Sequence, residues 1–383
     1  MIEVLPPTLF RSFWMGGFEG ASHKLCSGER INMIAVTQHD RQVAQDYQVL
    51  SSLGITTVRE SLSWHLIDCR THFDFSSLLS RLQASKASQT QVIWSLCHYG
   101  WPDDLDIFSG AFVDRFARYC GEVARLIAGQ ADEIAFYNPI NELSFLAWAV
   151  GNAGFIYPCL HDRSVEFKQQ LIRASIAGCE AIWENDPRAR IIHTDPIMQI
   201  IAPLGHPDLA RHALDETNSQ FEAWDMLGGW YQPELGGHPR YLDIIAVNYY
   251  HDNQWELERK RLSWEERLAS GDKRWLPAHV LIENVYNRYL RPIFIGESSH
   301  FGAGRGPWIR MIAQEVRQAR MNGVPVEGIC LYPVIDRPAW HDPNHWHNSG
   351  LLDVLQTDDG ELKRVLNQPY LEDLQWAQKY LAD

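Results

Sequence analysis

Short apolar runs rich in β-branched and aromatic residues recur along the chain, and longer stretches with apolar residues at helical spacing separate them. Short continuous apolar runs are typical of buried strands, whereas a 3.6-residue period is typical of helices. The predicted strands are Phe13–Phe18, Ile55–Ser61, Gln91–His98, Ile134–Ile140, Arg190–Asp195, Asp243–Tyr250, Pro292–Glu297 and Gly328–Ile335. The predicted helices are Gln38–Leu53, Ala111–Ile127, Ser164–Glu184, Ala278–Tyr289, Trp308–Met321 and Pro369–Leu381.

Eight such strands with helical connections favour a closed barrel over an open sheet. No G-x-G-x-x-G motif follows the first strand, so a dinucleotide-binding open sheet is not indicated. The 383 residues also fall within the size range of barrels with insertions. We therefore predict an α/β fold, a single (β/α)8 TIM barrel over residues 1–383 with loop insertions at its C-terminal face. The charged segment Trp255–Trp275 would be a solvated loop-helix insertion or a wall of the substrate cleft.

Charge and cysteine content limit the partners and the cellular compartment that the sequence predicts. Acidic residues outnumber basic ones by 48 to 34, which argues against nucleic acid as a partner. There is no apolar run of the roughly 18 residues that a membrane span requires, and the N-terminal MIEVLPPTLFRSFW lacks the apolar core of a signal peptide. Seven cysteines without C-x-x-C spacing favour reduced thiols, with Cys97 and Cys330 in buried strands. These features predict a cytoplasmic location.

Polar residues stand at the carboxyl ends of the predicted strands, which is where barrel enzymes build their active sites. The successive strand ends carry Arg59-Glu60, His98, Asn141-Glu142, Asn248-Tyr249-Tyr250, Glu297, and Tyr332 with Asp336. A lone glutamate at such a position is more often a solvated or salt-bridged residue than a catalytic one. The combination of arginine, asparagine, tyrosine and two glutamates is far more specific.

Glu142 and Glu297 together suit the cleavage of a glycosidic bond. One carboxylic acid protonates the leaving oxygen while the other, ionised, attacks the anomeric carbon, and retaining enzymes hold the two groups about 5 Å apart. The fourth and seventh strands lie nearly opposite each other in an eight-stranded barrel. Arg59 would keep Glu297 ionised, and Tyr250 would donate a hydrogen bond to the same carboxylate.

Several segments resemble glycoside hydrolase family 1, the β-glucosidase family of the retaining (β/α)8 glycosidases. The resemblance spans nearly the whole chain. It rests on the segments RESLSW (59–64), SLCHYGWP (95–102), YNPINE (137–142), IAVNYY (245–250), IFIGES (293–298), GICLYPVIDRPAW (328–340) and NSGLLD (348–353). By this resemblance Glu142 is the acid/base and Glu297 the nucleophile of a retaining glycosidase without a cofactor.

The resemblance also implies substrate contacts. Asn141 would bind the sugar 2-hydroxyl, His98 would bind another hydroxyl, and Asn248 belongs to the similar sixth-strand motif. Asp336 and Trp340 would shape the sugar subsite.

Departures from the family pattern fall in the pocket that would recognise the terminal sugar. Ala339 stands where the family has a sugar-binding glutamate, and Tyr332 where it has a platform tryptophan. His23 replaces the first-strand glutamine, with Glu19 as a nearby competitor for the role. Ser298-Ser299 and Leu143 also differ from the family residues beside the two glutamates. The chain resembles a divergent relative, and specificity for glucose does not carry over.

The other aromatic and histidine residues allow several interpretations. Trp101 and Trp148 would line the cleft or join the core, whereas Trp94 lies mid-strand and favours the core. The His-rich loop His341–Asn348 would contact substrate, be an ordinary loop, or, with the lowest weight, bind a metal. Cys97 and His98 are adjacent strand residues on opposite faces, which excludes a Cys–His couple. No G-x-S-x-G motif indicates a serine nucleophile.

The predicted function is therefore a retaining β-glycosidase acting on a small carbohydrate substrate. A transglycosylase would use the same two glutamates, and sequence does not separate these two activities. A carbohydrate-binding barrel without catalysis should lack one of the glutamates. A metal-dependent barrel hydrolase should carry His ligands at the first and fifth strand ends, where this chain has Gly16-Gly17 and a single His193. The sequence predicts no metal site and leaves the oligomeric state open.

Overall fold

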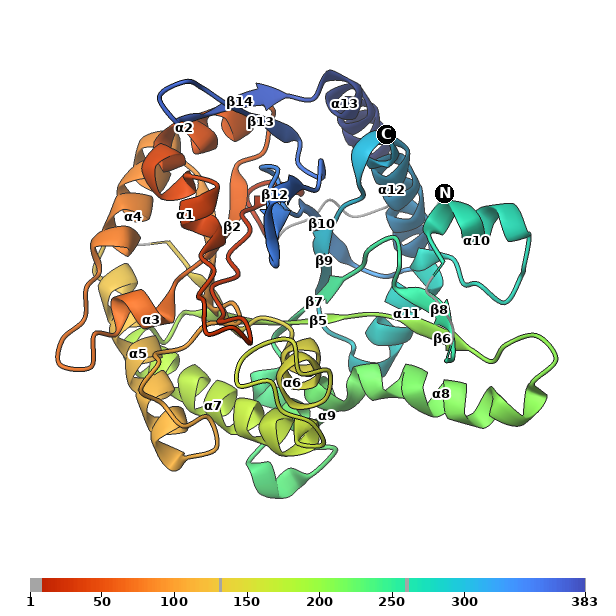
Figure 1. The fold of residues 1–383 in the computed structure, drawn as a ribbon, viewed down its shortest axis with the longest axis horizontal. Coiled ribbons are helices and arrows are strands. Elements are labelled where there is room, and N and C mark those ends of the chain that lie inside the picture. The colour runs from red at the N-terminus through yellow and green to blue at the C-terminus, as the bar shows by residue number, and fades with distance from the viewer. Residues whose placement is uncertain (1–8, 131–132, 259–261, 383) are drawn as a thin grey trace.

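The computed structural model of the protein describes residues 9–130, 133–258 and 262–382. Eight parallel strands close into a barrel in the order β1-β10-β9-β7-β5-β4-β3-β2 (Figure 1). Their bounds are β1 Trp14–Gly17, β2 Thr57–Ser61, β3 Gln91–Cys97, β4 Phe136–Ile140, β5 Arg190–Pro196, β7 Ile244–Asn248, β9 Ile293–Ser298 and β10 Val326–Leu331. All eight predicted strands are confirmed, and so is the predicted fold class. That residues 1–383 form a single domain stays a prediction.

The inside of the barrel is packed with side chains rather than hollow. Seven of the eight strands contribute to one buried cluster within the barrel wall, closed at one end by the ring of Phe10. That ring lies 5.1 Å from the Phe136 ring and 5.0 Å from the Phe294 ring. At the other end, Gly17 leaves room for the Tyr332 ring, since a methyl group at this position would collide with it. The strands thus form a rigid support for the side chains at their carboxyl ends.

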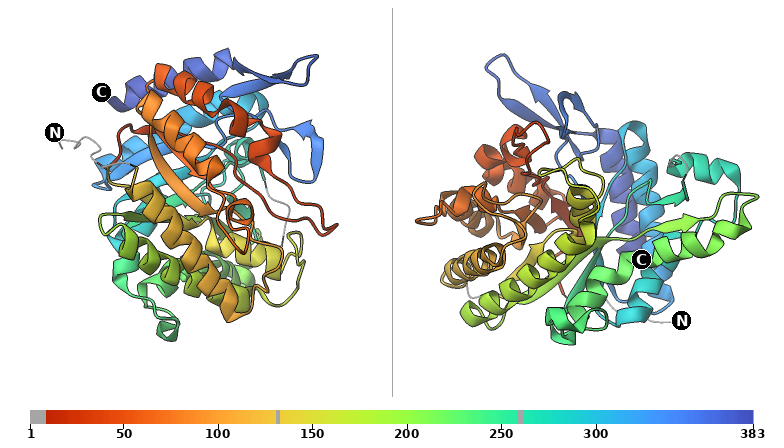
Figure 2. Two further views of the ribbon diagram at one scale, coloured as in Figure 1. Left: turned by 90° about the vertical axis from the view of Figure 1, so that its left-hand side faces the viewer. Right: turned by 60° about the horizontal axis from the view of Figure 1, so that its bottom comes forward.

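Helices surround the barrel (Figures 1 and 2). Their apolar faces are buried in the main core. Helix α5 (Gly110–Ala128) shows why, because its buried residues recur at three- and four-residue spacing. The other large helices are α2 His39–Ser52, α4 Ser76–Ser88, α7 Ser164–Asn185, α11 Ala278–Tyr289, α12 Arg305–Met321 and α13 Gln368–Ala382. Six of these seven match predicted helices. Helix α4 was not predicted, because its apolar residues are less clearly segregated to one face.

The shorter elements cluster at the carboxyl ends of the strands and were not predicted individually. The helices are α1 Met33–Val36, α3 Trp64–Ile67, α6 Leu143–Gly151, α8 Ala210–Asn218, α9 Glu222–Gly228 and α10 Trp264–Ser270. The additional strands are β6 Gln199–Ile201, β8 Gln254–Glu256, β11 Pro338–Ala339, β12 Asp342–Trp346, β13 Leu352–Gln356 and β14 Leu362–Leu366. Strands β6 and β8 form a parallel two-stranded sheet. Together with α8 and α10 it lies on one side of the barrel (Figure 1).

The charged segment Trp255–Trp275 contains the end of β8 and helix α10, and its residues 259–261 lie outside the described residues. Helix α10 begins with a capping box in which Ser263 and Glu266 exchange hydrogen bonds. Trp255 reaches the cavity described below, whereas α10 does not line it. Both interpretations hold in part, because the segment is mainly an insertion and its first residue is a wall of the cleft.

The expectation of reduced thiols is wrong for one pair of cysteines. Cys26 and Cys159 form a disulfide between the loop after β1 and the loop after α6, across 133 residues of sequence. No spacing motif in the sequence predicts this pair, because the two loops come together only in the folded protein. Of the remaining five free cysteines, four are buried and Cys69 is exposed. The cytoplasmic location, which rested partly on reduced thiols, stays a prediction. Within the described residues, no helix combines the length and apolar character needed to cross a bilayer.

Candidate active site

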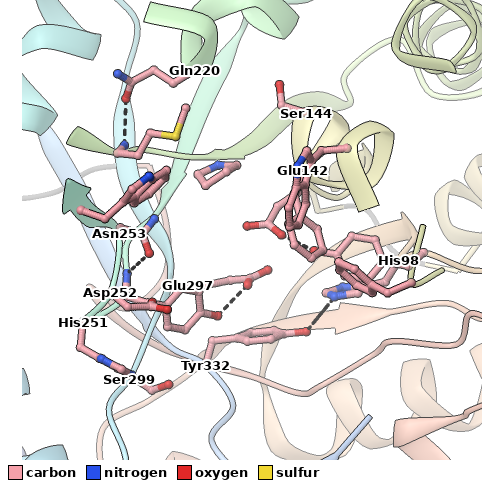
Figure 3. Close-up of a pocket in the computed structure, with 18 of the residues that line it drawn as sticks. His98, Glu142, Ser144, Gln220, His251, Asp252, Asn253, Glu297, Ser299 and Tyr332 are labelled. Atoms are coloured by element: carbon pink, nitrogen blue, oxygen red, sulfur yellow. Dashed lines mark hydrogen bonds between the residues drawn. The ribbon is translucent and has the colours of Figure 1, made fainter. Parts of the chain in front are cut away.

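A cavity of about 860 Å³ opens at the carboxyl ends of the barrel strands. It is lined by seven of the predicted site residues, which come from different strands and loops (Figure 3). These are Glu19, His98, Glu142, Tyr250, Glu297, Tyr332 and Trp340. Figure 3 shows the side chains of Glu142 and Glu297 pointing toward each other across this cavity.

Glu297, on β9, is buried and held from two sides. The guanidinium of Arg59, from β2, places Nη1 2.6 Å from Glu297 Oε1. Tyr250, just after β7, donates its hydroxyl to Glu297 Oε2 over 2.7 Å. Arg59 also donates to the backbone carbonyl of Gly296 at 3.1 Å, which fixes its orientation. A carboxylate that accepts charge-assisted hydrogen bonds from an arginine is stabilised in its ionised form.

Glu142 stands two residues after the end of β4, and among the described residues no arginine contacts its carboxyl group as Arg59 contacts that of Glu297. Its backbone has a φ of 49°, a left-handed conformation that costs a non-glycine residue about 1 kcal/mol or more and recurs at functional sites. Asn248 donates Nδ2 to Glu142 Oε1 at 2.8 Å, and Tyr99 donates its hydroxyl to Oε2. Burial and, second, the negative charge of Glu297 outweigh these hydrogen bonds and raise the pKa of Glu142 to about 8. Glu142 therefore carries a proton at neutral pH.

Asn141 connects the two glutamates. Its Oδ1 accepts a hydrogen bond from Arg59, and its Nδ2 donates to the Tyr99 hydroxyl at 3.0 Å. Arg59 in turn contacts Glu297, and Tyr99 contacts Glu142. Like Arg59 and Asn248, Asn141 lies behind the cavity rather than on its lining. These three residues orient the glutamates, and a shift of either carboxylate would disturb the partners of the other.

The end of the cavity around Glu19 is polar and tightly packed. Glu19 Oε2 lies 3.1 Å from Arg337 Nε, and Glu19 Oε1 lies 3.7 Å from His98 Nε2. Burial raises the pKa of Glu19, although the positive charge of Arg337 opposes this. Burial and then the charge of Arg59 lower the pKa of His98 well below its usual value, so its imidazole is neutral. Tyr332 completes this end, with its hydroxyl 3.4 Å from His98 Nδ1.

Of the described residues that were predicted to contact substrate, five do not line the cavity: Asn141 and Asn248, which orient the glutamates, and His23, Trp101 and Asp336. His23 is buried with its ring 4.9 Å from the Trp340 ring, and burial, followed by the charge of Arg30, lowers its pKa to about 3. Trp101 packs in the core between Phe112 and Phe167. Asp336 lies behind the wall, where it accepts the Ser349 N–H at 3.0 Å.

The remaining alternatives are resolved for the described residues. Trp148 lines the cavity, whereas Trp94 is buried in the core as predicted. None of residues 341–347 is among those lining the cavity, so the His-rich segment favours the ordinary-loop interpretation there. In the described parts of the chain no three His, Cys, Asp or Glu side chains are grouped to hold a metal ion. His193 is fully buried away from the cavity.

Three residues of the site were missed by the sequence analysis. Tyr99 and Arg337 lie within segments that resemble the family, SLCHYGWP and GICLYPVIDRPAW. Tyr99 stands two residues after β3 and was available to the strand-end reasoning, whereas Arg337 lies in a loop. Asp195 is the last acidic residue of the fifth strand and was available to the same strand-end reasoning. It accepts hydrogen bonds from Ser144, two residues after Glu142.

Solved structures with a similar fold are numerous and cover nearly the whole chain. The β-glucosidase from Thermotoga maritima in complex with glucoimidazole is 14% identical, with a TM-score of 0.76 over 97% of this chain and 99% of its own. The AHE enzyme from Alicyclobacillus herbarius is also 14% identical, with a TM-score of 0.76 over 98% and 99% of the two chains. A family 1 β-glucosidase structure from Thermotoga maritima is 12% identical, with a TM-score of 0.73 over 98% and 99%.

These similarities concern the fold. At 12–14% identity they establish an eight-stranded parallel barrel of the same overall build. No protein-family model and no curated protein matches the sequence. The resemblance to glycoside hydrolase family 1 is thus confirmed at the level of the fold.

Proposed function

We propose that the protein is a retaining β-glycosidase, a divergent relative of glycoside hydrolase family 1, that hydrolyses a small β-glycoside. The observation that carries the proposal is the contrast between two glutamates in one cavity. Glu297 receives hydrogen bonds from Arg59 and Tyr250, which favour its ionised form. Glu142 has a raised pKa and holds a proton at neutral pH. A retaining glycosidase requires this division of roles.

In the first step, the Glu297 carboxylate attacks the anomeric carbon and the bond between that carbon and the leaving oxygen breaks. Glu142 gives its proton to the leaving oxygen, so that the aglycone departs as a neutral alcohol. The product is an ester between Glu297 and the sugar. Glu142 is now an anion, and its pKa falls because the charge on Glu297 has been neutralised.

In the second step, Glu142 takes a proton from water and the water oxygen attacks the anomeric carbon. The ester bond breaks, Glu297 leaves as a carboxylate, and Glu142 is again protonated. Two inversions give net retention. Arg59 and Tyr250 hold Glu297 in place throughout, and Asn141, behind the lining, connects the partners of both glutamates.

The glutamate roles are tested by variants assayed on activated aryl β-glycosides of several sugars with added azide. We expect Glu297→Ala to lose at least about 10³-fold in kcat and, with azide, to release a glycosyl azide of inverted configuration. Glu142→Ala should keep the first step on activated leaving groups and give an azide of retained configuration. The exposed Glu372→Ala is the matched control. An inactive wild-type protein, or full activity in either variant, would contradict the proposal.

A further inference from the structure

The cavity extends well beyond the space around Glu142 and Glu297, and its far part differs in chemistry from the end around Glu19. We call this part the outer chamber. It is lined by Phe145, Trp148, Phe155, Met198, Ile200 and Trp255. We propose that the outer chamber binds a large apolar aglycone, so that the substrate is the β-glycoside of a long alkyl or aryl alcohol rather than an oligosaccharide. This inference rests on the proposed function and specifies its substrate class.

The outer chamber lies on the side from which the leaving group departs. Phe145 and Trp148 belong to α6, which begins immediately after Glu142. Because Glu142 would protonate the leaving oxygen, the aglycone attached to that oxygen must lie next to α6. Figure 3 shows Gln220 and Asn253 on the opposite side of the two glutamates from His98. The sugar would occupy the polar end near His98, and the aglycone the other end.

Two apolar walls form the outer chamber. On one side the rings of Phe145, Trp148 and Phe155 lie 5.6–6.1 Å from one another. On the other side Ile200 and Trp255 come from the β6–β8 sheet and Met198 immediately precedes β6. All three belong to a separate small cluster that α8 supports from behind. Each wall has its own support, so the space between the walls persists without a ligand.

Polar side chains also line the outer chamber, and several of them already have hydrogen-bond partners within the protein, although elsewhere on the cavity lining the buried His251 Nδ1 has none among the described residues. Gln220 accepts the Met198 N–H at 3.0 Å and donates to the Thr217 carbonyl at 2.6 Å. Asn253 accepts the Tyr250 N–H at 3.0 Å and donates to the Ile197 carbonyl at 2.8 Å.

The same holds for other polar groups of this lining. The Ser144 hydroxyl donates to Asp195 at 2.9 Å, and Lys168 pairs with Glu222 at 2.7 Å. Glu216, at the exposed rim, lies 3.6 Å from His212. A second sugar would bury hydroxyl groups against partners that are already occupied, which is unfavourable, whereas an apolar group would gain from leaving water.

Large apolar side chains are left exposed where the outer chamber opens. Trp148 is 43% exposed, Phe155 39% and Val165 62%, and all three line the cavity. Exposed apolar groups gathered at a concave surface are typical of a ligand site. An apolar aglycone would cover them and remain continuous with the cleavage site.

The test compares octyl, methyl and disaccharide β-glycosides of the sugar that the aryl panel identifies, with the octyl compound below its critical micelle concentration. We expect kcat/KM for the octyl glycoside to exceed that for the methyl glycoside by at least about 30-fold, since each buried CH2 is favourable, and to exceed that for the disaccharide. Met198→Gln, which conserves volume but adds an amide to the wall, should reduce the octyl-to-methyl ratio at least about fivefold. Met198→Leu and the remote, exposed Met321→Gln should retain it.

Thermal unfolding of each variant checks its fold, and the partly exposed Trp148→Gln repeats the test should Met198→Gln be unfolded. Equal or better hydrolysis of the disaccharide, or an unchanged octyl-to-methyl ratio in a folded chamber variant, overturns the inference while leaving the glycosidase proposal intact. Failure of the wild-type protein on every aryl glycoside defeats the proposed function instead. Calorimetric binding of octyl and methyl β-thioglycosides of several sugars then tests the outer chamber separately, and equal affinities of the octyl and methyl compounds overturn the inference.

Discussion

Glu142 and Glu297 carry the same side chain, and their surroundings alone give them different roles. Glu297 accepts hydrogen bonds from Arg59 and Tyr250, whereas Glu142 is buried beside the negative charge of Glu297. The pKa of Glu142 is raised to about 8, so its protonated form persists through neutral pH. We predict that kcat/KM falls as the pH rises through about 8, because the acid then loses its proton.

Removing the negative charge of Glu297 should lower the pKa of Glu142, because a like charge raises the pKa of a carboxylic acid. Glu297→Gln is inactive in this account, so the titration of Glu142 is followed directly by difference infrared spectroscopy, with Glu142→Gln as the reference. A Glu142 pKa that stays unchanged or rises in Glu297→Gln would contradict the account.

The structure brings together residues that were predicted at strand ends, because the position of a residue in a strand determines the direction of its side chain. Glu142, Glu297, Arg59 and Tyr250 stand at or just after strand ends, and the structure brings them together. Tyr99 stands two residues after β3, the same offset as Glu142 from β4 and Tyr250 from β7, so the same reasoning could have found it. Arg337 lies six residues after β10, in a loop whose path depends on contacts distant in sequence. Trp101, which the sequence left open between cleft and core, joins the core, and Asp336, expected to shape the sugar subsite, binds the Ser349 backbone.

At the scale of single elements, helix α6 determines the direction of Glu142. Its N-terminus is capped from another strand, because Asp195 at the end of β5 accepts the Ser144 N–H at 3.1 Å and the Ser144 hydroxyl at 2.9 Å. We predict that Asp195→Ala lowers the free energy of unfolding by about 1–2 kcal/mol, as cap removal does. It should also lower kcat, because Glu142 loses its fixed position.

Urea unfolding and steady-state kinetics check this prediction, with the exposed Asp358→Ala as the control. A variant with normal kcat and reduced stability would show that the cap supports the fold without positioning Glu142.

A buried charge cluster connects strand β2 to helix α2. His39 Nδ1 lies 2.7 Å from Asp46, and its Nε2 lies 2.7 Å from Glu60, while Arg81 and Arg364 pair with the same two carboxylates. Burial lowers the pKa of His39, but the charge of Glu60 and the hydrogen bonds to Asp46 and Glu60 outweigh this and raise it above 6.5. The imidazolium therefore contributes stability below the unfolded pKa, and this contribution is lost as the pH rises through the higher folded pKa.

We predict that His39→Gln lowers the melting temperature most at pH 5–6, and that the difference from wild type shrinks at alkaline pH. Thermal unfolding over this range measures it, and the exposed His72→Gln serves as the control. A difference that grows with pH would contradict the raised pKa.

Sequence patterns predicted the barrel strands better than the short helices and strands between them. The barrel strands are buried and most read as largely apolar runs, so all eight were found. The predicted eighth strand nevertheless begins two residues late and ends four residues late against β10. Helices α6 and α8 and the β6–β8 sheet are short, so they depend on tertiary packing, α6 against the main core and α8 against the β6–β8 sheet. The outer chamber is built from these elements and was invisible in the sequence for this reason.

At the scale of the whole molecule, the Cys26–Cys159 disulfide joins two loops beside the cavity across 133 residues. Closing a loop of this length restricts the unfolded chain strongly, and such bonds typically contribute about 2–4 kcal/mol. We predict that the Cys26→Ala/Cys159→Ala double variant unfolds at lower denaturant concentration than wild type, and that reducing agent removes the difference. Cys69→Ala is the control, and identical unfolding of the double variant and wild type without reductant would contradict the bond.

The central claim, a covalent intermediate on Glu297, is tested most directly by trapping it. The protein is incubated with activated 2-deoxy-2-fluoro-β-glycosides of the accepted sugar, which slow the second step more than the first. We predict a mass increase of one fluoroglycosyl group per chain and a labelled peptide in which Glu297 carries the sugar. Turnover of substrate without any adduct, or an adduct on another residue, would contradict the account.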